Sequence, residues 1–158
     1  MKLRLALAAL ALALVAIQLV PVDRTNPPVT GDIQAPEDVK VALRRACYDC
    51  HSHETKWPWY GHVAPFSWMV AAPVHRGRAA LNFSRWDDYT TREQIERWKE
   101  SWKNVEGGRM APWFYLPIHH DAVFTDAEER RVRIWALGSA HFAEEDLRAP
   151  PPAPAPAP

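Results

Sequence analysis

Apolar residues dominate the start of the chain. The run from Leu5 to Val20 is interrupted only by Gln18, and Lys2 and Arg4 precede it. This order is typical of an export signal or an N-terminal membrane helix, and the basic residues place the N-terminus on the cytoplasmic side. We interpret residues 1–22 as a signal peptide or a membrane anchor. A retained anchor is favoured because the small-residue triplets lie inside the run.

The pattern changes after the apolar run. Residues 23–35 contain two prolines and a glycine without apolar periodicity, which indicates a linker. Pro36 then begins a helix with Glu37 and Asp38 in its first turn. Since Val39, Leu43 and Ala46 share one face, the helix carries an apolar stripe and ends near residues 47–50.

Three later segments also show helical periodicity. The first spans about residues 65–81, where Pro73 predicts a kink or an interruption. The second and third begin with the capping-box pairs Thr90/Glu93 and Thr125/Glu128, and they end at Gly107 and Gly138. No useful strand pattern occurs, so the fold class is all-α with about four helices in a domain over residues 36–142. Residues 143–158 end in alternating proline and alanine and are predicted to be a disordered tail.

Composition narrows the function. Nineteen basic and nineteen acidic residues give a net charge of zero, which argues against a nucleic-acid partner. Eight tryptophans suit the enclosure of a cofactor, although a tryptophan-rich core without a ligand would have the same composition. Two cysteines are too few for a disulfide-stapled secreted domain.

Both cysteines belong to one motif, Cys47-Tyr48-Asp49-Cys50-His51. This is the attachment pattern of a c-type haem, in which two thiols bind the porphyrin covalently and the histidine binds the iron. A zinc site would need further ligands such as His53 or His62. A thioredoxin-like redox pair would need a βαβ unit, which the pattern does not predict. We therefore predict one covalent haem c, with His51 as the proximal iron ligand.

Met110 is the predicted distal ligand. It follows a glycine pair in a loop ahead of the last helix, and its thioether would complete His/Met coordination. Met69 is the rival, but its spacing with Phe66 and Val70 indicates a core residue. Any of six histidines could instead give bis-His ligation: His53, His62, His75, His119, His120 and His141.

Bulky aromatic residues flank the motif and the methionine loop. The candidates for the walls of a haem pocket are Trp57, Trp59, Tyr60, Trp68 and Trp113. Arg76, Arg78 and Arg109 could pair with the haem propionates. Each of these side chains could equally be a surface or core residue without a cofactor contact.

Taken in order, these parts resemble a class I cytochrome c. More closely, the chain resembles a small bacterial family named for its haem-binding domain. The residues that carry this resemblance are the run 47–60, the segments 64–68 and 81–86, and Met110-Ala111-Pro112. It covers about residues 35–140 and implies an exported, cytochrome-c-like domain with one haem. The family's Met-Pro-Pro is Met-Ala-Pro here, and its following His-Pro is His119-His120.

These observations predict a single-electron carrier on the periplasmic side of the inner membrane. It would be tethered by the N-terminal segment, or released to the periplasm if that segment is cleaved, and would exchange electrons with redox partner proteins. No acid–base or nucleophile constellation indicates an enzyme. Two alternatives remain: a peroxidase or a gas or redox sensor with an open distal site, served by His53, His62 or His120, and a structural haem subunit of a membrane complex.

Overall fold

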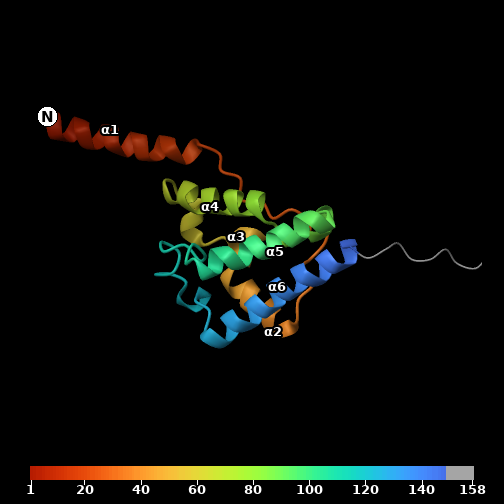
Figure 1. The fold of residues 1–158 in the computed structure, drawn as a ribbon. Coiled ribbons are helices and arrows are strands. Elements are labelled where there is room, and N and C mark those ends of the chain that lie inside the picture. Colours follow the sequence, from red (N-terminus) through yellow and green to blue (C-terminus); the bar gives the residue numbers. More distant parts are fainter. Residues whose placement is uncertain (149–158) are drawn as a thin grey trace, which may run out of the picture.

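The computed structural model describes residues 1–148, and within them the regular elements are helices joined by loops (Figure 1). The α-helices are α1 (Lys2–Ala16), α2 (Glu37–Ala46), α3 (Tyr48–His51), α4 (Phe66–Ala80), α5 (Thr91–Glu106) and α6 (Asp126–Arg148). Four 3₁₀ turns join them: η1 (Ile17–Leu19), η2 (Trp59–His62), η3 (Trp86–Asp88) and η4 (His120–Ala122). The only β pairing in the described part is a single bridge between Gly31 and Arg85. The all-α prediction is confirmed.

Helix α1 projects away from the other helices (Figure 1). None of its residues is buried, and the 18 residues Lys2–Leu19 are long and apolar enough to cross a membrane. The segment meets the domain at its end, where Gln18 exchanges two hydrogen bonds with the backbone of Ala64. Gln18 Nε2 donates to the Ala64 carbonyl at 3.2 Å, and the Ala64 N–H donates to Gln18 Oε1 at 2.9 Å.

The segment 23–35, predicted as a linker, runs along the domain in the structure. The N–H groups of Thr30 and Gly31 both donate to the Ser84 carbonyl, and Trp86 N–H donates to the Gly31 carbonyl. Ile33 is buried in the main apolar cluster. Sequence periodicity did not reveal this packing, because an extended segment can bury one side chain without any repeat.

The main core forms where α2 and α6 meet the segments around η3. Its buried members are Ile33, Val39, Ala42, Leu43, Tyr48, Phe83, Trp86 and Val132. The predicted stripe of the first helix is therefore largely confirmed, since two of its three residues lie in this cluster. Tyr48 also belongs to the core, which puts the cysteine motif directly against the main apolar cluster.

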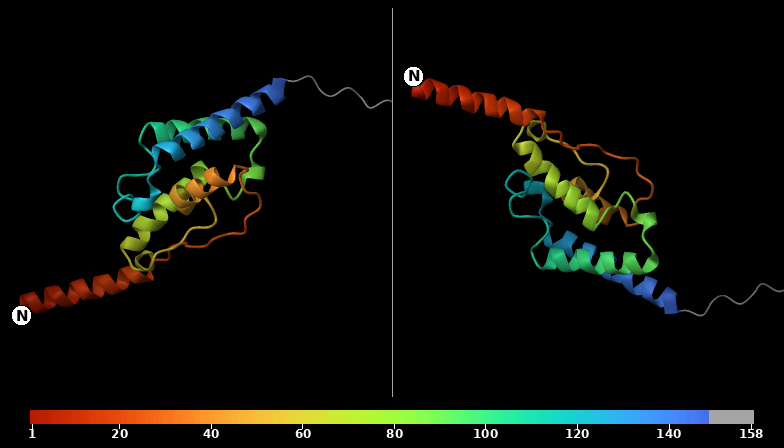
Figure 2. Two further views of the ribbon diagram at one scale, coloured as in Figure 1. Left: turned by 90° about the horizontal axis from the view of Figure 1, so that it is seen from below. Right: turned by 90° about the horizontal axis from the view of Figure 1, so that it is seen from above.

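Helices α5 and α6 pack side by side along much of their length (Figure 2). Both predicted capping boxes are present, because Thr90 and Glu93, and likewise Thr125 and Glu128, exchange side-chain and backbone hydrogen bonds. The predicted stop at Gly138 was wrong, and α6 continues through residues 143–148 that we assigned to the tail. Its buried stripe Val132, Ala136 and Ala140 passes Gly138, so packing on α5 overrides the local propensity. The remaining tail lies outside the described residues.

Helix α4 passes through Pro73 without interruption. Proline removes one backbone donor and leaves the carbonyl of residue 69 without its helical partner. Met69 is 66% exposed, so the missing bond falls on the solvent-facing side of α4 rather than in the core. The same exposure contradicts the prediction that Met69 is a core residue.

The loop after α5 lies beside the start of α4. All three views place residues 107–119 next to η2 and the first turn of α4 (Figures 1 and 2). Both sides carry large exposed apolar side chains: Trp59, Val63, Phe66 and Met69 on one, and Met110, Trp113, Phe114 and Ile118 on the other. The fold thus brings the methionine loop near the aromatic loop that follows the cysteine motif.

Glu128 gives the fold a defined acid sensitivity. The Thr125 backbone N–H, Arg45 and the Thr125 hydroxyl lower the pKa of Glu128 from 4.5 to about 2. A carboxyl whose pKa is lower in the folded state stabilises the fold above its unfolded pKa, and this contribution is lost as pH falls from about 5 towards 2. We expect Glu128→Gln to reduce the free energy of unfolding at pH 7 by about 0.5–1 kcal/mol and to flatten its decline in this pH range.

Urea titrations of the unfolding transition at pH 7 and pH 3 measure both effects. Glu129→Gln is the matched control, because the Glu129 side chain makes no ion pair or hydrogen bond within residues 1–148. An equal loss in both variants would contradict the role of Glu128.

Candidate functional site

One helical turn carries the complete cysteine motif. The backbone N–H groups of Cys50 and His51 both donate to the Cys47 carbonyl, at 3.2 and 2.9 Å. This bonding closes the short helix α3 directly behind α2, with Cys47 as the joint. Residues three and four apart lie on one face of a helix, so Cys47, Cys50 and His51 point to the same side. Both thiols are free.

A backbone carbonyl fixes the orientation of His51. Its Nδ1 lies 3.0 Å from the Leu81 carbonyl oxygen. Since a carbonyl can only accept, Nδ1 carries the proton and the lone pair of Nε2 stays free. Burial lowers the pKa of His51, and the carbonyls of Leu81 and Gly77 offset this only in part. The imidazole is therefore neutral and oriented at pH 7, as a metal ligand requires.

The two thiols are protonated at neutral pH. Burial raises the pKa of Cys47 to about 12 and that of Cys50 to about 11, with smaller contributions from Cys50 and Asp49 respectively. A zinc site would stabilise thiolates and would need further ligands close by. Within residues 1–148 no group of three or more His, Cys, Asp or Glu side chains is placed to hold a metal ion. The donor set therefore does not fit the alternative of structural zinc.

Helix α4 touches α3 at Gly77. A Cβ atom at this position would lie 2.3 Å from the Cys50 carbonyl oxygen, which is closer than real Cβ contacts. Only glycine allows the two helix backbones to approach this closely. The contact sets the position of Leu81, one turn later, whose carbonyl accepts from His51.

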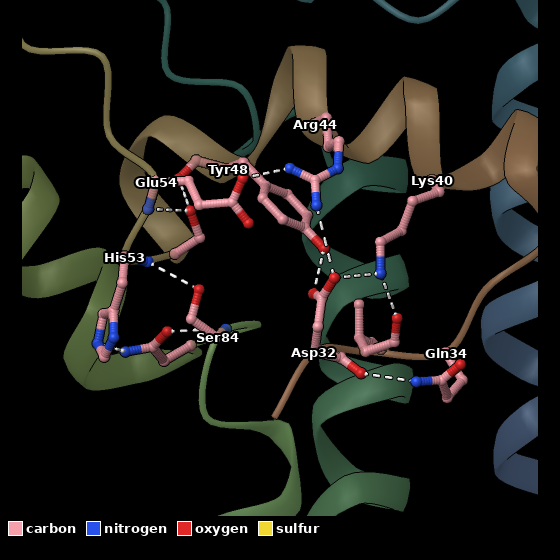
Figure 3. A network of polar contacts seen from close by, with 11 residues as sticks. Asp32, Gln34, Lys40, Arg44, Tyr48, His53, Glu54 and Ser84 are labelled. Carbon is pink, nitrogen blue, oxygen red and sulfur yellow. Dashed lines mark hydrogen bonds and ion pairs between the residues drawn. The ribbon is translucent and has the colours of Figure 1, made fainter. Parts of the chain in front are cut away.

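Tyr48, within the motif, joins a network of polar contacts with Asp32 and Arg44 (Figure 3). Its ring stacks on Phe83 at 5.1 Å, and its hydroxyl donates to Asp32 Oδ1 at 2.7 Å. Asp32 also pairs with Lys40 at 2.6 Å, and the Arg44 guanidinium lies over the Tyr48 ring and pairs with Glu54. Charge-assisted hydrogen bonds of this kind hold α2, α3 and the preceding segment in one arrangement.

The histidines near the motif are largely engaged elsewhere. His53 Nδ1 bonds to the Pro28 carbonyl at 2.9 Å, and its Nε2 lies 2.8 Å from Asn82 Nδ2. With both ring nitrogens engaged, His53 does not fit the predicted role of a distal ligand or acid–base group. His75 bonds to the Asp23 carbonyl, and His141 pairs with Glu145 on α6.

Arg78 ties the loop after the motif to the N-terminal segment. Its guanidinium donates to the carbonyls of Ser52 and Thr25 and to the side chains of Asn26 and Thr55. The arginine is thereby committed to protein groups rather than free for a propionate. Arg109, the second candidate, similarly bonds to Asn104 and Lys103 at the end of α5.

The predicted pocket residues differ in how far they are buried. Trp57 is partly buried, and its indole N–H is buried without a hydrogen-bond partner. Trp59 and Trp113 are 80% and 82% exposed, and Tyr60 packs edge-on against Trp59. Trp68 lies nine residues before Gly77 on α4, which at about 100° per residue puts it on the face opposite the contact with Cys50. The structure therefore does not bring Trp68 to the cysteines.

Met110 is 40% exposed, in the loop that begins at Gly107. The backbone N–H groups of Arg109 and Met110 both donate to the Asn104 carbonyl, which folds the start of the loop back on α5. Further along, the Tyr115 hydroxyl donates to Asp49 Oδ2 at 3.0 Å. Because Asp49 stands between the two cysteines, this bond ties the methionine loop to the motif.

Sequence reasoning missed Gly77, Leu81 and Tyr115. A glycine inside an apolar helical segment is a usable signal of close packing, so Gly77 could have been found. Leu81 acts through its backbone carbonyl, which no residue type reveals. Tyr115 could have been suspected as a polar aromatic residue in the methionine loop, but its partner depends on the tertiary fold.

Comparison with known proteins gives one match. A family model described as "Haem-binding domain" matches residues 12–137, which is most of the chain. No curated protein and no solved structure matches.

The close contact at Gly77 predicts that alanine substitutions at Gly77 and Gly138 have opposite effects on the free energy of unfolding. We expect Gly77→Ala to lower the free energy of unfolding by about 1–3 kcal/mol, because the new methyl group would overlap the Cys50 backbone. Gly138→Ala, inside α6 with no atom within 4 Å of its Cβ position, should raise it by about 0.5–1 kcal/mol.

Urea unfolding followed by tryptophan fluorescence measures both changes. If Gly77→Ala were as stable as Gly138→Ala, α3 and α4 could not be packed as described.

Proposed function

Because the chain belongs to the haem-binding domain family, we propose that it carries one covalently bound haem c and transfers single electrons. The observation that supports this most is the turn of α3, where two protonated thiols and a neutral imidazole with a free Nε2 share one face. No other group of residues in the described part of the chain offers the same donor set.

The donor set fits the chemistry of attachment. Each thiol would add across one vinyl C=C bond of the porphyrin, with sulfur bonding to one carbon and hydrogen to the other. The addition consumes no oxidant and releases no leaving group, and it starts from the reduced cysteines that the structure contains. His51 would bind the iron through Nε2, held in place by its bond to Leu81.

The surroundings also suit a large flat group with polar edges. Large apolar side chains are exposed both on the η2 and α4 side and on the methionine loop, including Trp59, Phe66 and Trp113. Trp57 adds a buried N–H donor without a protein partner. A bound haem would cover apolar surface of this kind and could accept a hydrogen bond at a propionate.

We assign Met110 as the distal ligand. The bond between Tyr115 and Asp49 brings its loop to the motif. A thioether and an imidazole together favour ferrous iron relative to two imidazoles and leave no open position for a substrate. Electron transfer is therefore preferred over peroxidase or sensor chemistry. His53, one candidate acid–base group for such chemistry, has both ring nitrogens in hydrogen bonds with protein groups.

The N-terminal helix supports a membrane-tethered carrier. The 18 residues Lys2–Leu19 are long and apolar enough to span a bilayer, and Gln18 binds the Ala64 backbone just before α4. With the N-terminus in the cytoplasm, the domain would lie on the periplasmic side, where redox partner proteins could reach it. A retained anchor agrees better with the Gln18 contact than a cleaved signal does.

Covalent attachment can be tested on protein matured with the c-type haem assembly machinery. The intact mass should equal that of the polypeptide plus one haem, and the haem should stay with the protein in acid acetone, because thioether bonds survive that solvent. The double variant Cys47→Ser/Cys50→Ser should release its haem. Release of the haem from the wild-type protein would refute covalent binding.

Distal ligation can be tested with a pair of methionine variants. The oxidised wild-type protein should show the weak far-red absorption band that a thioether ligand gives on ferric haem. Met110→Ala should abolish this band and lower the reduction potential, because a histidine, water or no ligand would replace the sulfur. Met69→Ala is the control and should retain both properties. Loss of the band in Met69→Ala alone would reverse the assignment.

A further inference from the structure

Asp49 is the point where three segments meet. Its backbone carbonyl accepts from Thr55 Oγ1 at 2.7 Å, its Oδ1 accepts from the Lys56 N–H at 3.0 Å, and its Oδ2 accepts from the Tyr115 hydroxyl at 3.0 Å. The first two bonds close the loop directly after the motif. The third joins residues 66 positions apart, so it depends entirely on the tertiary fold.

The loop 107–119 has few other polar ties. Its other hydrogen bonds stay within the loop or reach its immediate neighbours in the chain, the end of α5 and η4. Within residues 1–148, the bond from Tyr115 to Asp49 is the only hydrogen bond from this loop to a segment that precedes α5. The position of the loop relative to the cysteines therefore depends on this contact and on apolar packing.

Tyr115 is held as a donor. Its ring is stacked on that of His119, with centroids 3.7 Å apart and an angle of 3° between the planes. His119 Nδ1 also bonds to the Tyr115 carbonyl, which fixes the pair as a unit. Burial and the neighbouring Asp49 carboxylate raise the pKa of Tyr115, so the hydroxyl keeps its proton.

We propose that the Tyr115–Asp49 hydrogen bond is a latch that holds the loop 107–119 against the haem motif and so positions Met110. Tyr115 is a positioning residue, because it acts on the iron only through the loop that carries the methionine. The consequence for Met110 rests on the proposed function, whereas the latch itself concerns only the two protein segments.

The test uses the haem-loaded full chain with Tyr115→Phe, which keeps the ring and removes only the hydroxyl. We expect amide hydrogen exchange in residues 107–119 to become about tenfold faster, as the loss of a hydrogen bond to a charged group implies. The far-red thioether band should weaken, while the exchange of α5 and α6 stays unchanged. Ile118→Val, a small change at an exposed position of the same loop, should alter neither the exchange nor the band.

A second variant, Asp49→Ala, tests the acceptor of the hydrogen bond. If the latch is the cause, adding Tyr115→Phe to Asp49→Ala should produce no further acceleration of loop exchange, because the bond is already absent. Additive effects would overturn the latch, and so would unchanged exchange in Tyr115→Phe.

The two proposals fail in different ways. Faster loop exchange in Tyr115→Phe, together with a wild-type protein that lacks the thioether band, would support the latch and reject Met110 as the ligand. A normal wild-type band that Met110→Ala abolishes, with loop exchange unchanged by Tyr115→Phe, would support the ligand and reject the latch.

Discussion

The close contact between α3 and α4 is the constraint on which the candidate site depends. At Gly77 the two helix backbones approach without an intervening side chain. This places the end of α4 so that the Leu81 carbonyl reaches His51 and the next segment can turn back, where Phe83 N–H donates to the His51 carbonyl at 2.7 Å. One glycine thus sets both the orientation of the imidazole and the path of the chain after it.

The two residues between the cysteines have separate structural tasks. Successive helical residues differ in direction by about 100°, so Tyr48 and Asp49 cannot face the same way as Cys47, Cys50 and His51. Tyr48 enters the core and binds Asp32, whereas Asp49 binds the loops on either side of the site. The thiols and the imidazole therefore share one face of the turn, and the side chains on its other faces bind the rest of the protein.

The same arrangement explains how an N-terminal segment without helical periodicity becomes part of the domain. Arg78 bonds to residues on both the loop after the motif and the segment before α2, and Ser84 receives the N–H groups of Thr30 and Gly31. These bonds hold the chain between α1 and α2 against the domain. At its start, Gln18 binds the Ala64 backbone. These hydrogen bonds connect the apolar N-terminal helix to the segment that carries the cysteine motif.

Much of the fold was accessible from the sequence, because its signals are local. Apolar periodicity identified α2, α5 and α6, and the Thr–Glu pairs marked two helix starts correctly. The shared face of Cys47, Cys50 and His51 was also accessible, since residues three and four apart lie on one side of a helical turn. The continuation of α4 through Pro73 and of α6 past Gly138 was not, because packing outweighs the local cost of proline or glycine.

Only the tertiary structure decided what surrounds the motif. The Leu81 carbonyl that orients His51 carries no residue-type signal, and the Tyr115–Asp49 bond joins segments that no spacing rule connects. Trp68 and Met69 illustrate the same limit: helical spacing gave their relative directions, but only the contact of Gly77 with Cys50 showed which side of α4 faces the motif. The sequence determined that two thiols and an imidazole lie together in one turn. The tertiary structure determined which carbonyl and hydroxyl groups bind that turn, because long-range contacts depend on how the helices and loops pack against each other.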